Sequence, residues 1–213
     1  MKPLRPQDPS FILASHSPRR LELSQRIGFE PVVFGSDVPE EKADDESPVE
    51  YARRLAQAKA RDVAATHADN DELPGWILSA DTIVVHGGDV LEKPVDAEDA
   101  RRMLASMSGN EHIVITAFCW LWRAPGGEVE DRLEVVRDVS ARVWMRQLSP
   151  DMMARYVATE EPMDKAGSYG IQDIGSTLVR RIDGSYFCVV GLPVCEVVEE
   201  LEKLGGLKDY PFI

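Results

Sequence analysis

The amino-acid sequence predicts an α/β protein with a mixed β-sheet. Short apolar runs that suit strands alternate irregularly with segments whose apolar residues recur at helical spacing. A late Asp183-Gly184 pair separates the runs 176–182 and 185–190, which predicts an antiparallel hairpin with a two-residue turn. The chain has 213 residues, 44% of them hydrophobic, which is enough for one sizeable core or for one domain with two lobes.

The individual elements follow from caps, turns and periodicity. Residues 11–15 predict a strand, and Ser17 is a favourable N-cap for a helix that starts with Pro18 and is ended by Gly28. Further strands are expected at 31–34, 76–85, 90–91, 112–122 and 133–145. Further helices are expected at 48–66, 97–107 and 150–159, with a final helix that ends near residue 204.

The start of the first helix carries the first functional signal. Arg19 and Arg20 follow Pro18 directly, where a helix presents unpaired N–H groups and a partial positive charge. Two guanidinium groups at such a place suit an anion with several oxygens, such as a phosphate chain. Taken alone, the pattern more often indicates an ordinary capped helix with two solvated arginines. The later motifs reverse that balance.

Asp81 interrupts the most apolar strand of the chain, 76–85. An apolar run of this kind suits a central strand that is covered on both faces. A carboxylate there is costly unless it is paired or bound to a metal. We therefore expect Asp81 either to lie at a strand edge or to be functional, and we favour the functional interpretation.

Two other charged positions are less distinctive. Lys59 lies on the predicted helix 48–66, and its pattern alone indicates a solvated surface lysine. The acidic segment 37–50 predicts a solvated loop. Glu40 or Glu41 would be an exception if this loop folds over a metal site.

Composition narrows the classes of protein. The net charge is −13 and the pI is about 4.8, which argues against a surface for polymeric nucleic acid. An acidic protein can still hold a small polyanion in a local basic pocket, often with a divalent cation. The sequence contains no GxGxxG, P-loop, GxSxG or HExxH motif, so it gives no signal for a dinucleotide fold, serine hydrolysis or zinc catalysis.

The cysteines and apolar runs indicate the compartment. Cys119, Cys188 and Cys195 all lie in apolar stretches, so we expect buried thiols outside disulfides, which suits a reducing compartment. The most apolar run, 113–122, is far shorter than a membrane span. A cytoplasmic protein with no membrane partner is expected. His112, on an apolar strand, is expected to be a hydrogen-bonded core residue.

Seven groups of residues, taken together, resemble the Maf nucleotide pyrophosphatases. They occur in the order of that family and span nearly the whole chain. They are residues 13–20 (Leu-Ala-Ser-His-Ser-Pro-Arg-Arg), 80–84 (Ala-Asp-Thr-Ile-Val), 92–94 (Glu-Lys-Pro), 108–109 with His112 and 116–117, 161–162 with 164–167 (Asp-Lys-Ala-Gly), 169–172 (Tyr-Gly-Ile-Gln) and 191–193 (Gly-Leu-Pro).

The resemblance implies both a fold and a reaction. The fold would be a single Maf-type domain over 1–213, with a loose lead-in at 1–10 and a tail at 205–213. Its mixed, twisted sheet would be flanked by helices and form two lobes with a central cleft, as in inosine triphosphatases. The reaction would be hydrolysis of a nucleoside triphosphate between its α and β phosphates, yielding the monophosphate and pyrophosphate. A divalent cation, Mg²⁺ by preference, would be required.

The resemblance also assigns roles to individual residues. It makes Asp81 the proton acceptor and ties Arg19, Thr82 and Gln172 to base selection. The Ser-Pro-Arg-Arg and Gly-Ile-Gln versions of the motifs look like the subgroup that acts on dTTP and UTP. The family also accepts modified pyrimidine triphosphates. Gln172 has both a donor and an acceptor, which matches one edge of a pyrimidine.

A triphosphate with its metal needs cationic and hydrogen-bonding groups along its oxygens. The candidates are Ser15, Arg19, Arg20, Lys59, Lys93 and Lys165. Asp81 could act as the base, or as a metal ligand that lowers the pKa of the attacking water, and the sequence leaves both roles open. Glu40 is the best second carboxylate for the metal.

Two departures and three alternatives remain. Ser79 stands where glycine usually precedes the Ala-Asp-Thr motif, and Asp173 follows Gln172 where glycine is frequent. The added acid leaves the preferred base open. The alternatives are a 7-methyl-GTP pyrophosphatase, another purine triphosphate pyrophosphatase, and a non-enzymatic nucleotide-binding regulator of cell division. A homodimer is compatible with the family.

Overall fold

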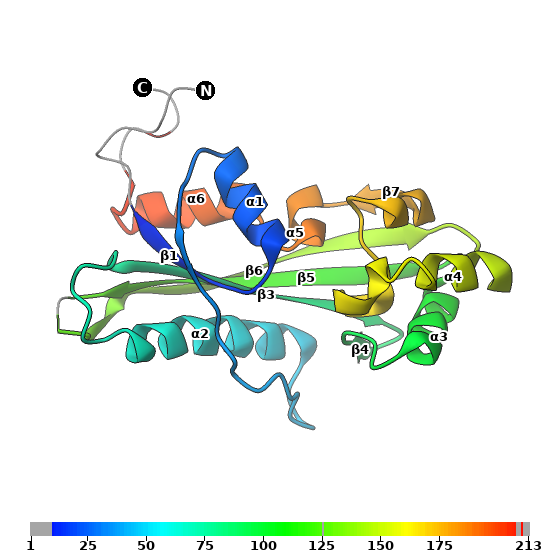
Figure 1. Cartoon of the computed structure of the whole chain (residues 1–213), viewed down its shortest axis with the longest axis horizontal. Coiled ribbons are helices and arrows are strands. Elements are labelled where there is room, and N and C mark those ends of the chain that lie inside the picture. The colour runs from blue at the N-terminus through cyan, green and yellow to red at the C-terminus, as the bar shows by residue number, and fades with distance from the viewer. Residues whose placement is uncertain (1–9, 125, 208–209, 211–213) are drawn as a thin grey trace. The chain divides into compact units, whose positions relative to one another are not determined.

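The computed structural model describes residues 10–124, 126–207 and 210. Within these residues, seven strands form a mixed sheet of order β2-β1-β3-β5-β6-β7, with β4 paired to β3 (Figure 1). The strands are β1 (Phe11–Ala14), β2 (Val32–Phe34), β3 (Trp76–His86), β4 (Asp89–Leu91), β5 (Glu111–Arg123), β6 (Val129–Met145) and β7 (Val179–Asp183). Strand β1 runs parallel to β2 and β3, whereas β4 and β7 run antiparallel to β3 and β6. The predicted mixed α/β class is confirmed.

Among the described residues, five of the six α-helices lie close to their predicted positions, and α5 lies where a strand was predicted. The α-helices are α1 (Pro18–Arg26), α2 (Pro48–Thr66), α3 (Ala97–Met107), α4 (Pro150–Val157), α5 (Tyr186–Val190) and α6 (Val194–Lys203). Three 3-10 helices are η1 (Glu161–Asp164), η2 (Ala166–Ser168) and η3 (Ile174–Leu178). Among the described residues, no helix is both long enough and apolar enough to cross a membrane.

The chain divides into two compact units, and β3, β5 and β6 each contribute residues to both. Unit 1 contains residues up to Asp81, 117–138 and those from Gly191 onward, whereas unit 2 contains 82–116 and 139–190. The unit boundary therefore passes between the two neighbouring site candidates Asp81 and Thr82.

Unit 1 is built around an aromatic cluster. The ring of Phe11 in β1 lies edge-on to Trp120 and Phe29, with centroid separations of 5.1 and 5.5 Å. The indole of Trp120 donates to the carbonyl of Val197 at 2.8 Å, which ties α6 to the sheet. Helix α2 covers one face of the unit 1 strands, and α1 and α6 cover the other (Figure 1). Strands β1 and β3 are thus covered on both faces, as their continuous apolar sequences predict.

Unit 2 has its own apolar core. It includes Leu104 and Met107 from α3, Tyr156 from α4 and Val143 from β6, all of them buried. His112 is also buried, and its Nε2 lies 2.7 Å from the Tyr169 hydroxyl, so the predicted hydrogen-bonded core histidine is confirmed. Burial lowers the pKa of His112 to about 4.

The predicted late hairpin is wrong in its second arm. The first arm is β7, but the partner of β7 is β6, with Val143 opposite Ile182. Residues 186–190 form α5 instead of a strand. Ser185 starts this helix, because its hydroxyl accepts from the Cys188 N–H at 3.2 Å. A five-residue apolar run is too short for periodicity to distinguish a helix from a strand.

One cysteine also departs from expectation. Cys119 and Cys188 are buried as predicted, but Cys195 is exposed on α6. Helix α6 buries Val194 and Val197 on the opposite side, so an apolar neighbourhood in sequence does not bury every residue of an amphipathic helix.

Candidate active site

Strand β3 and helix α2 place a carboxylate against an ammonium group in unit 1. Asp81 is 6% exposed and Lys59 is 7% exposed. The Nζ of Lys59 donates to Oδ1 of Asp81 at 2.6 Å. Asp81 is thus buried and paired, which agrees with the expectation that a buried carboxylate needs a partner because an unpaired buried charge is costly. The pattern-based interpretation of Lys59 as a solvated lysine is wrong, because its helix position faces the strand that carries Asp81.

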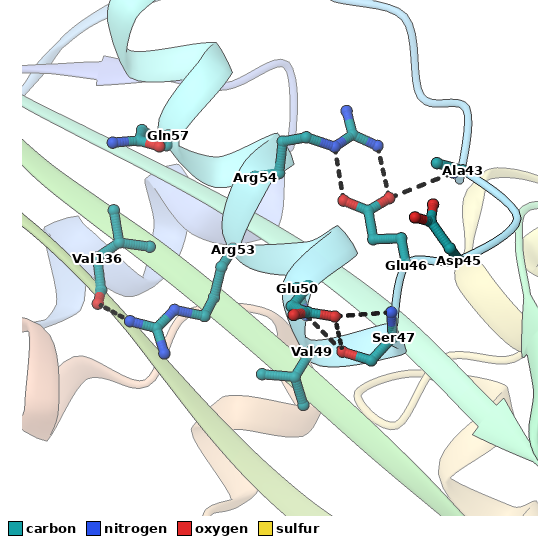
Figure 2. A pocket seen from close by; sticks show the side chains of 10 residues that line it. All are labelled: Ala43, Asp45, Glu46, Ser47, Val49, Glu50, Arg53, Arg54, Gln57 and Val136. Carbon is teal, nitrogen blue, oxygen red and sulfur yellow. Dashed lines mark hydrogen bonds and ion pairs between the residues drawn. The ribbon is translucent and has the colours of Figure 1, made fainter.

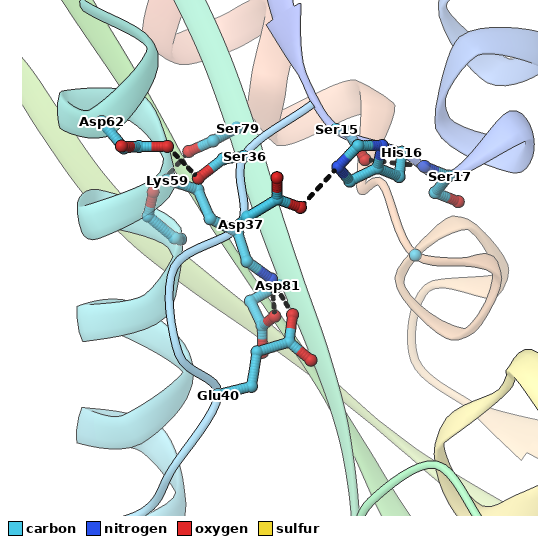
Figure 3. A network of polar contacts seen from close by, with 12 residues as sticks. Ser15, His16, Ser17, Ser36, Asp37, Glu40, Lys59, Asp62, Ser79 and Asp81 are labelled. Atoms are coloured by element: carbon cyan, nitrogen blue, oxygen red, sulfur yellow. Dashed lines mark hydrogen bonds and ion pairs between the residues drawn. The ribbon is translucent and has the colours of Figure 1, made fainter. Parts of the chain in front are cut away.

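Glu40 completes this cluster from the loop between β2 and α2. Its Oε1 accepts from the same Lys59 Nζ at 2.5 Å, so one ammonium group bridges two carboxylates (Figure 3). The neighbouring Glu41 contributes its backbone instead, because its carbonyl accepts from Arg54 at 2.8 Å. Of the two acids considered for a metal site, Glu40 is the one that shares the Lys59 ammonium group with Asp81.

The Glu40 loop is tied down before it reaches the cluster. The Ser36 hydroxyl donates to Asp62 of α2 at 2.6 Å. The His16 ring lies 3.2 Å from Asp37, and it lies so close to Gly35 that an added Cβ there would be 1.8 Å from a ring atom (Figure 3). These contacts were not anticipated from the sequence, where the acidic segment indicated only solvent exposure.

The β1–α1 turn brings a second set of predicted residues together in unit 1. The Ser15 hydroxyl accepts from Nη1 of Arg20 and from the Ser17 N–H, both at 3.1 Å. The Nε of Arg20 donates to the Gly191 carbonyl at 2.9 Å. Burial lowers the pKa of Arg20, and the charge of Asp81 opposes this effect. Arg20 therefore lies within electrostatic reach of the Lys59 cluster.

The N-terminus of α1 has the predicted residues but not the predicted cap. Ser17 occupies the N-cap position and Pro18 starts the helix, yet the Ser17 hydroxyl makes no cap hydrogen bond. The first amide groups of α1 are thus not occupied by this side chain. Arg19, half-buried, follows within the first turn.

Ser79 is accommodated in the interior of unit 1. It is fully buried in β3, two residues before Asp81, and its hydroxyl donates to the Ala56 carbonyl of α2 at 2.5 Å. The hydroxyl that serine adds at this position, where the Maf pattern has glycine, therefore has a hydrogen-bond partner. The bond connects β3 and α2, the two elements that carry Asp81 and Lys59.

The other predicted residues belong to unit 2. Thr82, half-buried, lies 2.9 Å from the Thr116 hydroxyl, which donates onward to the Cys188 carbonyl at 2.7 Å. Since Thr116 uses its proton there, Thr82 is the donor in the shared bond. Lys93 is exposed after β4.

Lys165 and Gln172 lie on the segment that follows α4. Lys165 is 11% exposed at its side chain, and its Nζ donates to the Glu161 carbonyl at 2.5 Å and to Asp164 at 2.6 Å. Gln172 is half-buried, just before η3, and Asp173 beside it is exposed. The sequence identified this segment as a loop, and it contains the short helices η1 and η2.

Sequence reasoning missed Glu161 as a site residue. Its carboxylate accepts from the Tyr156 hydroxyl and from the N–H groups of Ile174 and Gly175, each at 2.9 Å. Glu161 belongs to one of the motifs that resemble the family, but its partners are backbone N–H groups, which the sequence does not identify.

The donor set fits a hard divalent cation. Among the residues that the structure describes, no group of three His, Cys, Asp or Glu side chains is arranged to hold a metal. Glu40 and Asp81, however, both lie against one cationic nitrogen, and their oxygens are ligands that Mg²⁺ prefers. Mg²⁺ is commonly held by one or two carboxylates together with substrate phosphates and water.

A surface pocket at the start of α2 is a different feature. It is lined by ten residues, most of them polar, and no predicted site residue is among them (Figure 2). Two pairs of its side chains interact inside the pocket: Arg54 forms two bonds with Glu46, and Glu50 closes the capping box with Ser47. The capping box stabilises α2, which carries Lys59. The pocket itself is separate from the candidate active site.

The fold and the site define a mixed α/β protein in which a buried lysine bridges two carboxylates within electrostatic reach of Arg20 at the start of α1. The sequence model of the Maf-like protein family matches residues 10–204, and the chain belongs to this family.

Several curated relatives cover almost the whole chain. The dTTP/UTP pyrophosphatase of Escherichia coli is 46% identical over 203 residues, which are 94% of this chain and 95% of that protein. The dTTP/UTP pyrophosphatase of Syntrophotalea carbinolica is 45% identical, covering 94% of this chain and 87% of that protein. The enzyme of the same name from Geobacter metallireducens is 44% identical, covering 95% and 100%.

Proposed function

We propose that this protein hydrolyses dTTP and UTP, and modified pyrimidine triphosphates, to the nucleoside monophosphate and pyrophosphate. The observation that carries the proposal is the Lys59 bridge between Asp81 and Glu40, within electrostatic reach of Arg20. The names of the relatives support the same reaction.

The phosphate chain would bind at the start of α1. Arg19 and Arg20 supply positive charge there, and the Ser15 hydroxyl holds Arg20 in place. A helix N-terminus whose first amides are not capped by a side chain adds hydrogen-bond donors for phosphate oxygens. Lys93 and Lys165 are further candidates from unit 2.

Asp81 and Glu40 would hold Mg²⁺, with the remaining ligands from the triphosphate and water. The ion would supply charge neutralisation on the phosphate oxygens. Lys59 keeps both carboxylates directed to one point, because its ammonium donates to each of them.

In the reaction, water attacks the α-phosphorus and a new P–O bond forms. Asp81 takes the proton from the water, and the bond between the α-phosphorus and the oxygen bridging to the β-phosphate breaks. Pyrophosphate leaves with that oxygen and with the electron pair of the broken bond. The second proton of the water stays on the monophosphate, and Asp81 passes the first proton to solvent, which restores its carboxylate.

Base selection would depend on Arg19, Thr82 and Gln172. Thr82 donates its proton to Thr116, so it presents an acceptor to a ligand. The Gln172 amide offers both a donor and an acceptor, which complements the ring edge of thymine or uracil. The substrate is a small molecule, and we place the protein in the cytoplasm as a single Maf-type domain, for which a homodimer is one compatible assembly.

The test is pyrophosphate release from a panel of triphosphates with Mg²⁺. The expected result is rapid cleavage of dTTP and UTP, with 7-methyl-GTP, GTP and ATP cleaved more slowly. Preference for 7-methyl-GTP or another purine triphosphate would replace the proposed substrate class. If folded protein cleaves none of them, it is a nucleotide-binding module instead of an enzyme.

A further inference from the structure

Glu161 in η1 is the centre of a hydrogen-bond cluster in unit 2. Its Oε1 accepts from the Tyr156 hydroxyl and the Gly175 N–H, and its Oε2 accepts from the Ile174 N–H, each at 2.9 Å. The Tyr156 hydroxyl in turn accepts from the Gly170 N–H at 3.1 Å. One carboxylate and one phenol thus satisfy three backbone donors.

Those three donors lie at the two ends of one short segment, residues 170–175, which we name the Gln172 segment. Gly170 is its first residue, and Ile174 and Gly175 are its last two. Gln172 and Asp173 lie between these anchored ends. Because both ends are bound to the same pair of side chains, the path of the chain through Gln172 is restricted.

The packing around the anchored ends is close. A Cβ added to Gly175 would lie 2.2 Å from the Gly170 carbonyl oxygen and 2.5 Å from the Tyr156 hydroxyl. Tyr156 is 4% exposed, and burial raises the pKa of its hydroxyl, so the phenol stays protonated and donates to Glu161. The cluster therefore leaves little space in which the ends of the segment could separate.

We infer that Glu161, together with Tyr156, is a positioning residue that fixes Gln172 for the recognition of a pyrimidine ring. Glu161 acts through the backbone of the Gln172 segment and makes no contact with substrate in this scheme. The inference rests on the proposed function. It adds the residues that set the orientation of the Gln172 amide, which is proposed to select the base.

A positioning role and a purely structural role predict different kinetics. A misplaced Gln172 weakens binding of the base while leaving the phosphate chemistry in unit 1 intact, so KM rises and kcat changes little. A structural defect lowers the active fraction and therefore reduces kcat equally for every triphosphate. Discrimination between pyrimidine and purine triphosphates separates the two.

The experiment compares Glu161→Gln and Tyr156→Phe with the wild type on dTTP, UTP and GTP. The control is Glu160→Gln, which changes the neighbouring, exposed carboxylate. Glu161→Gln places an amide N–H against a backbone N–H, so we expect KM for dTTP to rise about tenfold with kcat within about threefold. The preference for dTTP over GTP should fall by a similar factor. Tyr156→Phe should act in the same direction, more weakly, and Glu160→Gln should match the wild type.

Two further measurements distinguish failure of the positioning role from failure of the proposed reaction. Calorimetric titration with dTTP reports base recognition even if the wild type hydrolyses nothing, which would overturn the proposed reaction alone. Hydrogen exchange at Ile174 and Gly175 should accelerate in Glu161→Gln. An unchanged dTTP affinity and unchanged preference in both variants, despite faster exchange, would refute the positioning role.

Discussion

The two units hold their polar side chains in different ways. In unit 1, Asp81 on β3 and Lys59 on α2 are buried, Glu40 joins them from the loop before α2, and ion pairs hold the three side chains together. In unit 2, Gln172 lies on a segment between short 3-10 helices, and backbone hydrogen bonds to Glu161 hold it. Groups on regular elements are placed more rigidly than groups on loops.

This difference suits a division of labour in the proposed reaction. The reacting phosphorus is common to all nucleoside triphosphates, and Asp81 and Glu40 are the residues proposed to act on it. The base varies between substrates, and Arg19, Thr82 and Gln172 are the residues proposed to select it. Changes in the Lys59 cluster should therefore reduce turnover for every substrate, whereas changes around Glu161 should alter which substrate is preferred.

The largest expected effect is that of Asp81→Asn. Asparagine has nearly the same shape but cannot accept the proton of the water, so we expect kcat to fall about 1,000-fold, a typical contribution of a general base. Pyrophosphate release measures the rate, and calorimetry with dTTP should show that binding survives. Asp151→Asn is the control, since Asp151 is exposed on α4 and pairs with Arg155 of the same helix. If binding is lost together with turnover in a folded variant, Asp81 serves chiefly as a metal or substrate ligand.

Lys59→Met tests the ion pairs of the same cluster through stability. It leaves the buried Asp81 carboxylate without its cation, so the free energy of unfolding should fall by about 3 kcal/mol. Urea denaturation measures the loss. Adding Asp81→Asn to Lys59→Met should restore part of it, because the uncompensated charge is removed. Lys203→Met, at an exposed i,i+3 pair, should cost under about 1 kcal/mol. Equal costs for the two lysines would contradict a buried role for Lys59.

The core of unit 2 has a pH-dependent element in His112. Its pKa is about 4 in the folded protein, against 6.5 for the unfolded chain, because burial disfavours the charged ring. As the pH falls, the unfolded state binds the proton first, so this contribution is complete above pH 6.5 and is lost between pH 6.5 and 4. The loss amounts to about 3 kcal/mol. Urea denaturation of wild type and His112→Gln across that range measures it, and a constant difference between them would count against this assignment.

The sequence predicted best where local chemistry determines structure. The capped helix from Pro48 and the apolar strand through Asp81 were located almost to the residue. It did not predict that Lys59 is buried. Lys59 lies four residues after Leu55 and four before Val63, on the buried face of α2, but a lysine is rarely buried unless it is paired, and its partner Asp81 lies on another element. Residues 186–190 were assigned to the wrong class because a short apolar run suits both helix and strand.

The site shows the same limit. The motif residues Ser15, Arg20 and Asp81 were identified from the chain, and the structure brings them within reach of one another. The Glu161 cluster was missed, because its partners are backbone N–H groups of residues 13 and 14 positions away. Backbone donors carry no signature in the sequence, so only the folded loop identifies the carboxylate that they bind.

The smallest expected effect compares two helix starts with the same Ser-Pro sequence. In unit 2 the Ser149 hydroxyl accepts from the Met152 N–H at 3.2 Å, whereas in unit 1 the Ser17 hydroxyl makes no such bond. Ser149→Ala should therefore lower the free energy of unfolding by about 1 kcal/mol, and Ser17→Ala by no more than a few tenths. Urea denaturation of the two variants under identical conditions measures the contrast. Equal losses would mean that Ser17 caps α1 in solution, and its hydroxyl would then compete with phosphate for the first amides of the helix.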